Sequence, residues 1–297
     1  MADFTTRIVG QFISGQVLFW GLALCLLGCF LSKFSRGRLP QAIARLAVLV
    51  GAIFIILSAA PLPFWTYGIL FGLLLLLWLR FNQKAVRSAK SDYALLALLL
   101  AQMLLMAGME IRYSLPPTIP LTQGHSLFVL GDSMSIGADP PGKNWPDLLG
   151  ELAHMKVRNF AFGGAKVETA LDEALRINTD DSLVIVELGG NDLLGGTPIR
   201  KFRADLEKML MRVCTAQRKV VMIELPLPPL YNRYGMVQRA LARAHGVTLV
   251  PKRYLAGVLS TPGATVDGLH LSNRGHTWFA HALFELRDVK SSGPARQ

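Results

Sequence analysis

Apolar positions divide this chain into two regions with different patterns. Four long stretches near the start are almost entirely apolar: Phe12–Leu31, Ala42–Ala60, Pro63–Leu79 and Tyr93–Met109. Each is close to the ~17–25 residues that a helix needs to cross a bilayer core. Helices that are apolar on every side lie in protein or in lipid, and four in succession favour lipid. The pattern predicts a transmembrane domain over residues 1–112, although one of the shorter stretches could instead lie at the interface or re-enter the membrane.

From residue 125 onward, short apolar runs alternate with amphipathic segments. Five apolar runs predict strands at 127–130, 157–162, 183–188, 220–225 and 247–250. Helical patterns cover about 143–154, 166–177, 199–217, 233–245 and 273–287. Because the strand runs are continuously apolar, we expect both faces of the sheet to be buried. Alternation of strands and helices is typical of an α/β fold with a parallel sheet between helices.

The two regions are joined by a short segment of distinct composition. Residues 113–124 contain three prolines and no charged side chain. Such a segment predicts a stiff linker that keeps a globular domain, over residues 125–290, close to the last apolar stretch. The final residues, 291–297, are polar and glycine-containing, and we expect them to be a disordered tail.

Positive charge is concentrated beside the apolar stretches. Up to Arg112 there are ten Lys or Arg residues against three acidic ones. Eight of these bases form two groups, one after the first stretch and one after the third: Lys33, Arg36, Arg38 and Arg45, then Arg80, Lys84, Arg87 and Lys90. Basic loops stay in the cytoplasm, and there they would face anionic lipid head groups. We therefore expect a multi-pass protein of the bacterial inner membrane.

This orientation also places the rest of the chain. With both basic loops inside and four spans, the N-terminus and the C-terminal domain lie outside, which in a Gram-negative cell is the periplasm. The C-terminal region itself carries 21 bases against 17 acids, a small excess. The high overall charge is thus explained by the membrane region, and we expect no nucleic-acid partner.

Unusual residues follow three successive strands of the predicted sheet. Ser133 follows the first strand, Gly163 and Gly164 follow the second, and Asn191 follows the third. In a parallel α/β sheet, functional groups gather at the carboxyl ends of the strands. We therefore expect these residues to meet at one edge.

Ser133 lies in the motif GDSMS, between Gly131 and Gly137. A serine on a tight turn at a helix start would expose its hydroxyl, and Gly131 would allow the sharp bend. The alternative is a simple helix cap, since Asp132, Ser133 and Ser135 are all good capping residues.

Asn191 lies in GGND, where two glycines end the third strand. Its side-chain amide could donate to a developing oxyanion, a contact whose loss costs roughly 10²–10³ in rate. The alternative is a turn of the Asx type. The glycines of FGGAK could offer a backbone N–H to the same oxyanion, or simply form a strand-to-helix turn.

Asp267 and His270 lie three residues apart in DGLH, before the last predicted helix. His270 could take a proton from Ser133 and return it to a leaving group, while Asp267 holds the imidazole. The alternative is an ordinary surface turn. The other five histidines lack a nearby acid in a comparable loop, and we expect His276 and His281 to be packing or surface residues. We predict no metal site, because the histidines lack ligand spacing and no cysteine cluster is present.

Together these motifs resemble those of the SGNH/GDSL hydrolase family, whose name comes from a Ser, a Gly, an Asn and a His. The matching residues are Ser133 in GDSMS, Gly164 in NFAFGGAK, Asn191 in GGND, and His270 with Asp267 in DGLH. The segments ELGGND and WPDLL are most similar to the corresponding sequences of the acyl-thioesterase/lysophospholipase branch. The resemblance covers about residues 125–288. One departure is Met134, where the family often has Leu, and it affects nothing catalytic.

The resemblance implies a three-layer α/β/α, flavodoxin-like fold with five parallel strands. It also implies a catalytic triad of Ser133, His270 and Asp267. The oxyanion hole would comprise the N–H groups of Ser133 and Gly164 and the amide of Asn191. No cofactor or metal is implied.

We therefore expect a membrane-anchored serine esterase that hydrolyses an acyl ester such as a lysophospholipid. One alternative is an O-acetyl esterase or acetyltransferase acting on an exported glycan, and another is a non-enzymatic accessory subunit. The bilayer and the acyl ester are the expected partners. One span would suffice as an anchor, so the others could also bind a membrane protein or a second copy, with Gln102 as the best candidate contact.

Overall fold

The computed structural model describes residues 2–34, 37–82, 89–137 and 142–288. The chain forms two compact units. One contains residues 11–114 together with 228–232, and the other contains the rest of the chain. The predicted disordered tail, 291–297, lies outside the described residues.

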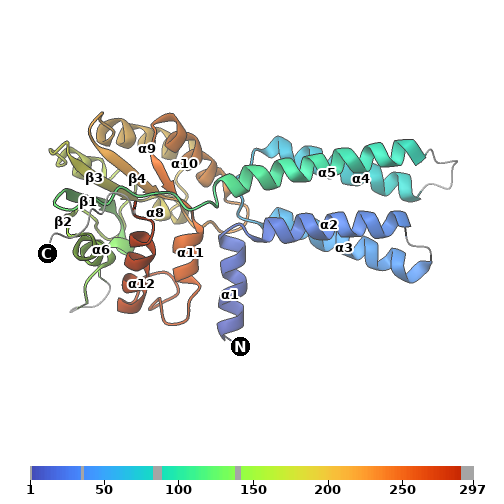
Figure 1. The fold of residues 1–297 in the computed structure, drawn as a ribbon, viewed down its shortest axis with the longest axis horizontal. Helices are drawn as coiled ribbons and strands as arrows, with labels where there is room; N and C mark the ends of the chain where they lie inside the picture. Colours follow the sequence, from blue (N-terminus) through green and yellow to red (C-terminus); the bar gives the residue numbers. More distant parts are fainter. Residues whose placement is uncertain (1, 35–36, 83–88, 138–141, 289–297) are drawn as a thin grey trace. The chain divides into compact units, whose positions relative to one another are not determined.

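The unit that contains residues 1–10, 115–227 and 233–297, called the sheet unit, is built on a five-stranded sheet whose neighbouring strands are all parallel (Figure 1). The strands are β1 (Ser126–Gly131), β2 (Lys156–Asn159), β3 (Ser182–Glu187), β4 (Lys219–Ile223) and β5 (Thr248–Val250), in the order β2-β1-β3-β4-β5. This is the flavodoxin-like order of doubly wound sheets. The predicted α/β fold with five parallel strands is confirmed.

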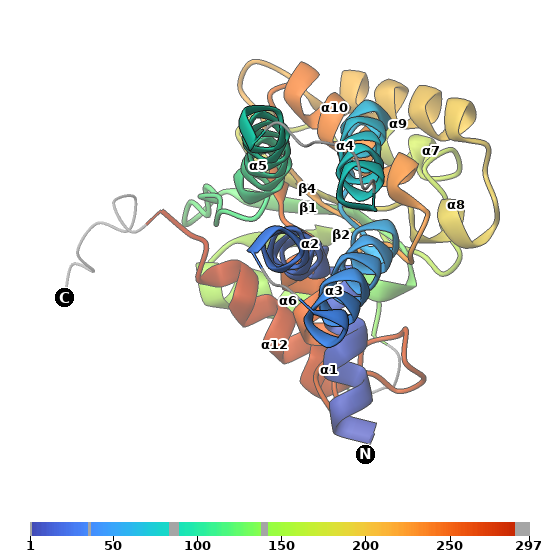
Figure 2. The same ribbon diagram turned by 90° about the vertical axis from the view of Figure 1, so that its right-hand side faces the viewer.

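Helices cover both faces of this sheet. They are α6 (Trp145–Ala153), α7 (Leu171–Leu175), α8 (Gly190–Leu194), α9 (Ile199–Val213), α10 (Asn232–Ala244), α11 (Arg253–Leu259) and α12 (Asn273–Phe284). Helices α9 and α10 lie on one side, and α6, α11 and α12 on the other (Figures 1 and 2). All six residues of β3 are buried, as its continuously apolar run predicts.

Three helices differ from the predicted pattern. Helix α7 is much shorter than the predicted 166–177, because residues 166–170 form turns in which the Lys166 N–H donates to Thr169 Oγ1 at 2.9 Å. Helices α8 and α11 were not predicted. With five and seven residues they are too short for a helical period to show in the sequence.

Part of the predicted linker packs against the sheet unit. Ile119 is fully buried, and its N–H donates to the carbonyl of Leu286 at 2.7 Å. Leu121 is also buried. The segment just before β1 therefore contributes to the core of this unit.

The other unit contains four apolar helices that run side by side (Figure 2). They are α2 (Val17–Phe34), α3 (Arg38–Leu57), α4 (Phe64–Asn82) and α5 (Ala89–Arg112). A helix that was not predicted, α1 (Ala2–Ile13), precedes them in the sequence, and most of its residues belong to the sheet unit. Helices α2, α3 and α5 are long and apolar enough to cross a membrane, and α4 has a shorter apolar segment, Phe64–Arg80. The four apolar stretches predicted from sequence are thus helical, and three of the helices are candidate spans.

Small residues let α2 and α3 pack closely. A Cβ added at Gly21 would lie 2.7 Å from the carbonyl oxygen of Gly51, and one at Gly28 would lie 2.6 Å from that of Ala44. Close approach through small residues is a common means of helix association in membranes. Gln102 of α5 is buried in the same unit, where its Nε2 donates to the carbonyl of Thr66 at 2.8 Å.

Candidate active site

The structure brings together the serine, histidine and aspartate predicted from the GDSMS and DGLH motifs. His270 Nε2 lies 3.1 Å from Ser133 Oγ, and His270 Nδ1 lies 2.6 Å from Asp267 Oδ2. Ser133 begins a short 3-10 helix, η1 (Ser133–Ser135), directly after β1. His270 and Asp267 come from the loop between α11 and α12.

The turn that carries Ser133 is fixed by its neighbours. Asp132 is the cap of η1, because its Oδ1 accepts from the N–H of Met134 at 2.9 Å. The capping function considered for the motif therefore belongs to Asp132, and the Ser133 hydroxyl lies against His270. Gly131 is required for close approach, since a Cβ there would lie 2.4 Å from Ser135 Oγ.

The loop that carries His270 is organised by the Asp267 carboxylate. Asp267 Oδ1 accepts from the backbone N–H groups of Leu269 at 2.9 Å and of His270 at 2.7 Å. The hydrogen bond from the His270 imidazole to Oδ2 and the two hydrogen bonds from backbone N–H groups hold the pKa of Asp267 well below its ordinary value. An ionised carboxylate at Nδ1 favours the tautomer with its proton there, which leaves Nε2 to accept from Ser133.

Asn191 and the FGGAK turn lie side by side. Asn191 Nδ2 donates to the carbonyl of Ala165 and to Asp132 Oδ2, both at 3.1 Å. Gly164 adopts a φ of 74° and is exposed. Asp192 joins the same two loops, because its Oδ2 accepts from the N–H of Val167 at 2.9 Å. The amide of Asn191 thus contacts a neighbouring carboxylate, a pairing that the sequence did not predict.

Two buried carboxyl groups lie beneath the serine turn. Burial raises the pKa of Asp132 to about 6. Burial and the charge of Asp132 raise the pKa of Glu187, at the end of β3, well above its ordinary value. Sequence reasoning missed Glu187. The available signal was an acidic residue inside a predicted strand, 183–188, whose other residues are all apolar.

A cavity of about 80 Å³ lies beside Ser133. Asp132, Glu187 and Asn191 supply its polar side. Its apolar wall comprises Leu194, Leu225, Pro226, Leu255, Leu259 and Leu269. This site can accept an apolar group beside a nucleophilic hydroxyl.

Across the described ranges, no group of three or more His, Cys, Asp or Glu side chains is placed to hold a metal ion. His276 is buried, and its Nδ1 accepts from the N–H of Trp145 at 3.2 Å, so it serves packing between α12 and α6.

A doubly wound sheet with a serine, a histidine and an aspartate in contact at its carboxyl edge is an arrangement found in serine hydrolases. Residues 129–278, half of the chain, match the GDSL-like lipase/acylhydrolase family, and the chain belongs to that family. The match begins within β1, after the apolar helices.

Three relatives illustrate the similarity. An arylesterase of Vibrio mimicus is 32% identical over 169 residues, which cover 52% of this chain and 84% of the arylesterase. The esterase TesA of Pseudomonas aeruginosa is 31% identical, covering 49% of this chain and 79% of its own length. A crystal structure of TesA is 28% identical, with a TM-score of 0.49, and covers 55% of this chain and 97% of that one. The family match and the two curated esterases show that the chain is a serine hydrolase that acts on ester bonds.

Proposed function

We propose that Ser133, His270 and Asp267 are the catalytic triad of a membrane-anchored esterase. The observation that carries this proposal is the continuous contact from Asp267 Oδ2 through both nitrogens of His270 to Ser133 Oγ, at 2.6 and 3.1 Å. These distances are within hydrogen-bond reach for a base and its nucleophile.

The reaction proceeds through an acyl-enzyme. His270 Nε2 takes the Ser133 proton as Oγ attacks the acyl carbonyl carbon, and it then returns that proton to the departing alkoxide. Water, deprotonated by His270, then attacks the acyl carbonyl carbon. The bond from that carbon to Ser133 Oγ breaks, His270 returns the proton to Oγ, and the carboxylic acid leaves. Asp267 keeps the imidazole in the required tautomer and stabilises the imidazolium.

The developing oxyanion is held by the N–H groups of Ser133 and Gly164 and by the amide of Asn191. Asn191 donates to Asp132 and Ala165 in the free site, so an oxyanion takes the place of one of these acceptors. Its bond to Ala165 supports the role of Gly164, because that bond places the glycine turn next to the amide.

The four apolar helices and the distribution of charge support membrane anchoring. The bases of the first 112 residues cluster where α2 meets α3 and where α4 meets α5, so both connections face the cytoplasm. The catalytic domain then faces the periplasm or the cell exterior.

A lipid ester such as a lysophospholipid is the substrate that this placement favours. Leu194 and Leu269 line the cavity and are 64% and 43% exposed, so an apolar surface continues from the cavity to its mouth. An acyl chain that is longer than the cavity can lie along this apolar surface. One Escherichia coli relative, 29% identical, carries the name thioesterase 1/protease 1/lysophospholipase L1.

The cavity volume favours a second candidate, an O-acetyl esterase or acetyltransferase acting on an exported glycan. A volume of about 80 Å³ is small. It is roughly half of the ~150 Å³ apolar cavity that holds benzene in a well-studied engineered protein. A short acyl group fits such a space without any rearrangement.

The test is an ester panel on the full-length protein in detergent. Acetyl, butyryl and palmitoyl esters of one alcohol, lysophosphatidylcholine and an acetylated oligosaccharide are compared. A preference for palmitoyl esters and lysophosphatidylcholine supports the lipid substrate, whereas acetyl-only turnover supports the glycan.

The triad is tested in the same preparation with a fluorophosphonate probe. Ser133→Ala loses both turnover and labelling, while Ser126→Ala, at the start of the same strand, retains both. Labelling that persists in Ser133→Ala contradicts the proposal.

A further inference from the structure

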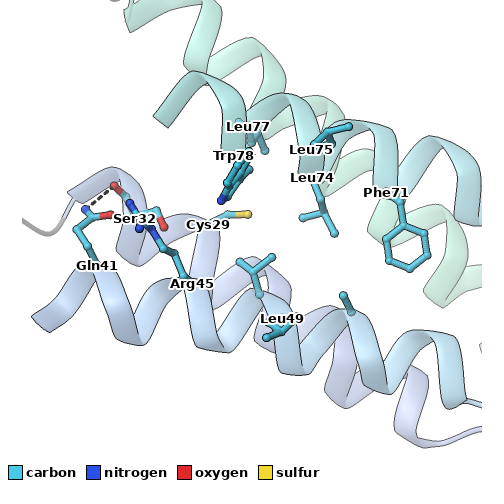
Figure 3. A pocket seen from close by; sticks show the side chains of 12 residues that line it. Cys29, Ser32, Gln41, Arg45, Leu49, Phe71, Leu74, Leu75, Leu77 and Trp78 are labelled. Carbon is cyan, nitrogen blue, oxygen red and sulfur yellow. Dashed lines mark hydrogen bonds between the residues drawn. The ribbon is translucent and has the colours of Figure 1, made fainter. Parts of the chain in front are cut away.

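The helical unit contains a cavity of about 540 Å³, lined mainly by α3 and α4 (Figure 3). This volume is within the ~300–1,000 Å³ of typical ligand sites. The cavity belongs to the four-helix unit alone, and none of its lining residues takes part in the esterase site.

The lining changes character along the cavity. Most of its length is apolar, with Leu49 and Ala52 on α3 and Phe71 and Leu74 on α4. Figure 3 shows Ser32, Gln41 and Arg45 gathered at one end, away from Phe71. An elongated apolar space with a polar, basic end matches the chemistry of an amphiphile.

The polar end is a defined structure. Gln41 Nε2 donates to the carbonyl of Ser32 at 3.0 Å, which ties the start of α3 to the end of α2. Trp78 of α4 also lines the cavity, beside Cys29 in Figure 3. Indole rings, with an apolar body and a polar N–H, are favoured at the boundary between lipid tails and head groups.

The cavity opens sideways. Leu49, Leu75 and Trp78 line it and are still 58%, 56% and 53% exposed. If α3 and α4 cross a bilayer, this opening faces acyl chains, so a lipid can enter laterally.

We propose that this cavity binds one acyl chain of an anionic phospholipid, with the lipid phosphate held at Arg45. The guanidinium forms paired, charge-assisted hydrogen bonds with phosphate oxygens. Among the described residues that line the cavity, Arg45 is the basic one. Anionic head groups are also the lipids that a basic membrane face attracts.

The shape of the lining favours an acyl chain over another helix. Helices in membranes associate through small residues that allow close approach. The small residues Gly21, Gly28 and Gly51 are already used between α2 and α3. The cavity wall instead carries Leu, Phe and Trp side chains, an irregular surface that a flexible chain can follow.

The test measures lipid retained by the full-length protein. Delipidated protein is exchanged into dioleoylphosphatidylglycerol or dioleoylphosphatidylcholine, which differ only in the head group, and bound phospholipid is counted by native mass spectrometry. We expect the wild type to retain the anionic lipid about tenfold better or more, the usual effect of hydrogen bonds to a charged group. Inorganic phosphate, which lacks an acyl chain, displaces neither lipid.

Two pairs of variants locate the site. Arg45→Ala removes the preference for the anionic lipid, whereas Arg38→Ala, an exposed base of the same helix outside the cavity lining, retains it. Ala52→Trp fills the cavity and abolishes retention of both lipids. Its neighbour Ile53 is 44% exposed and does not line the cavity, so Ile53→Trp leaves retention unchanged.

Three results would overturn the proposal: no retained lipid in the wild type, equal retention of the two lipids, or undiminished retention in Ala52→Trp. Turnover of a water-soluble ester is measured on each preparation. Because that activity resides in the sheet unit, it reports on the esterase proposal separately. A thermal melt of each variant in detergent shows whether its helical unit is still folded.

Discussion

The Glu187 carboxylate accepts a hydrogen bond from the hydroxyl of Ser135 at 2.7 Å. The same oxygen also lies 3.4 Å from the N–H of Asp132. Glu187 pairs with Gly131 in the β1–β3 register, so its carboxylate lies at the point where the serine turn begins. A buried acid on one strand therefore fixes the loop of its neighbour, with Ser133 in the middle of that loop.

This arrangement predicts a pH dependence of stability that Glu187→Gln reduces. Glu187 and Asp132 both have raised pKa values, so the folded protein holds protons that the unfolded chain has already lost. Their contribution to stability is complete below about pH 4 and declines as the pH rises, and for Asp132 this decline continues to about pH 6. Gln can still accept the two hydrogen bonds, and it removes one charge of the pair.

The measurement is a series of thermal melts from about pH 4 to pH 7, on wild type and Glu187→Gln. We expect the melting temperature of the variant, relative to that of the wild type, to increase as the pH rises. Glu151→Gln, at an exposed position, serves as control, and its melting temperature relative to the wild type should not change with pH. Parallel curves for Glu187→Gln and wild type would show that folding does not raise the pKa of Glu187.

The fold and the convergence of the site residues could be predicted because both follow from local patterns. A run such as LVIVEL is apolar on both faces, which is typical of a central parallel strand. In such a sheet Ser133 and Asn191 follow adjacent strands, and the topology brings them to one edge.

What escaped prediction depends on contacts between distant segments. Asn191 donates to Asp132, 59 positions away, and no sequence pattern specifies that distance or orientation. In the sequence, Glu187 is only the acidic residue near the end of an apolar run. Its buried contact with Ser135 depends on how the two strands pair in the fold. The cavity between α3 and α4 likewise depends on how the helices pack, and their apolar composition alone does not reveal it.

Replacing Asp267 with Asn tests its role in orienting His270. The amide can present an N–H to Nδ1, which favours the tautomer with the proton on Nε2, so the imidazole cannot accept from Ser133. We expect kcat to fall by about 10⁴, the effect of the same change in a well-characterised triad. Asp172→Asn, on an exposed site, is the matched control. A loss of less than about tenfold would argue against an orienting role.

Asn191→Ala tests the oxyanion donor. We expect kcat to fall by about 10²–10³ with little change in KM, because the contact forms fully only in the transition state. Asn159→Ala provides a control for structural damage. Asn159 Nδ2 also supports the serine turn, donating to the carbonyl of Ser135 at 2.7 Å, but it does not line the cavity. If the loss of activity in both variants is proportional to the decrease in their melting temperatures, Asn191 has only a structural role.

Gly51→Ala tests the close contact of α2 with α3. A Cβ at Gly51 would lie 2.7 Å from both Cys25 Sγ and the carbonyl oxygen of Gly21. Overpacking of this kind costs about 1–3 kcal/mol, so thermal stability in detergent falls. Gly72→Ala, on α4, is the matched control, because no atom lies within 4 Å of the added Cβ. That variant keeps or gains stability, since alanine favours a helix over glycine by up to ~1 kcal/mol. Equal shifts in the two variants would mean that the glycines of α2 and α3 are not packed as the structure shows.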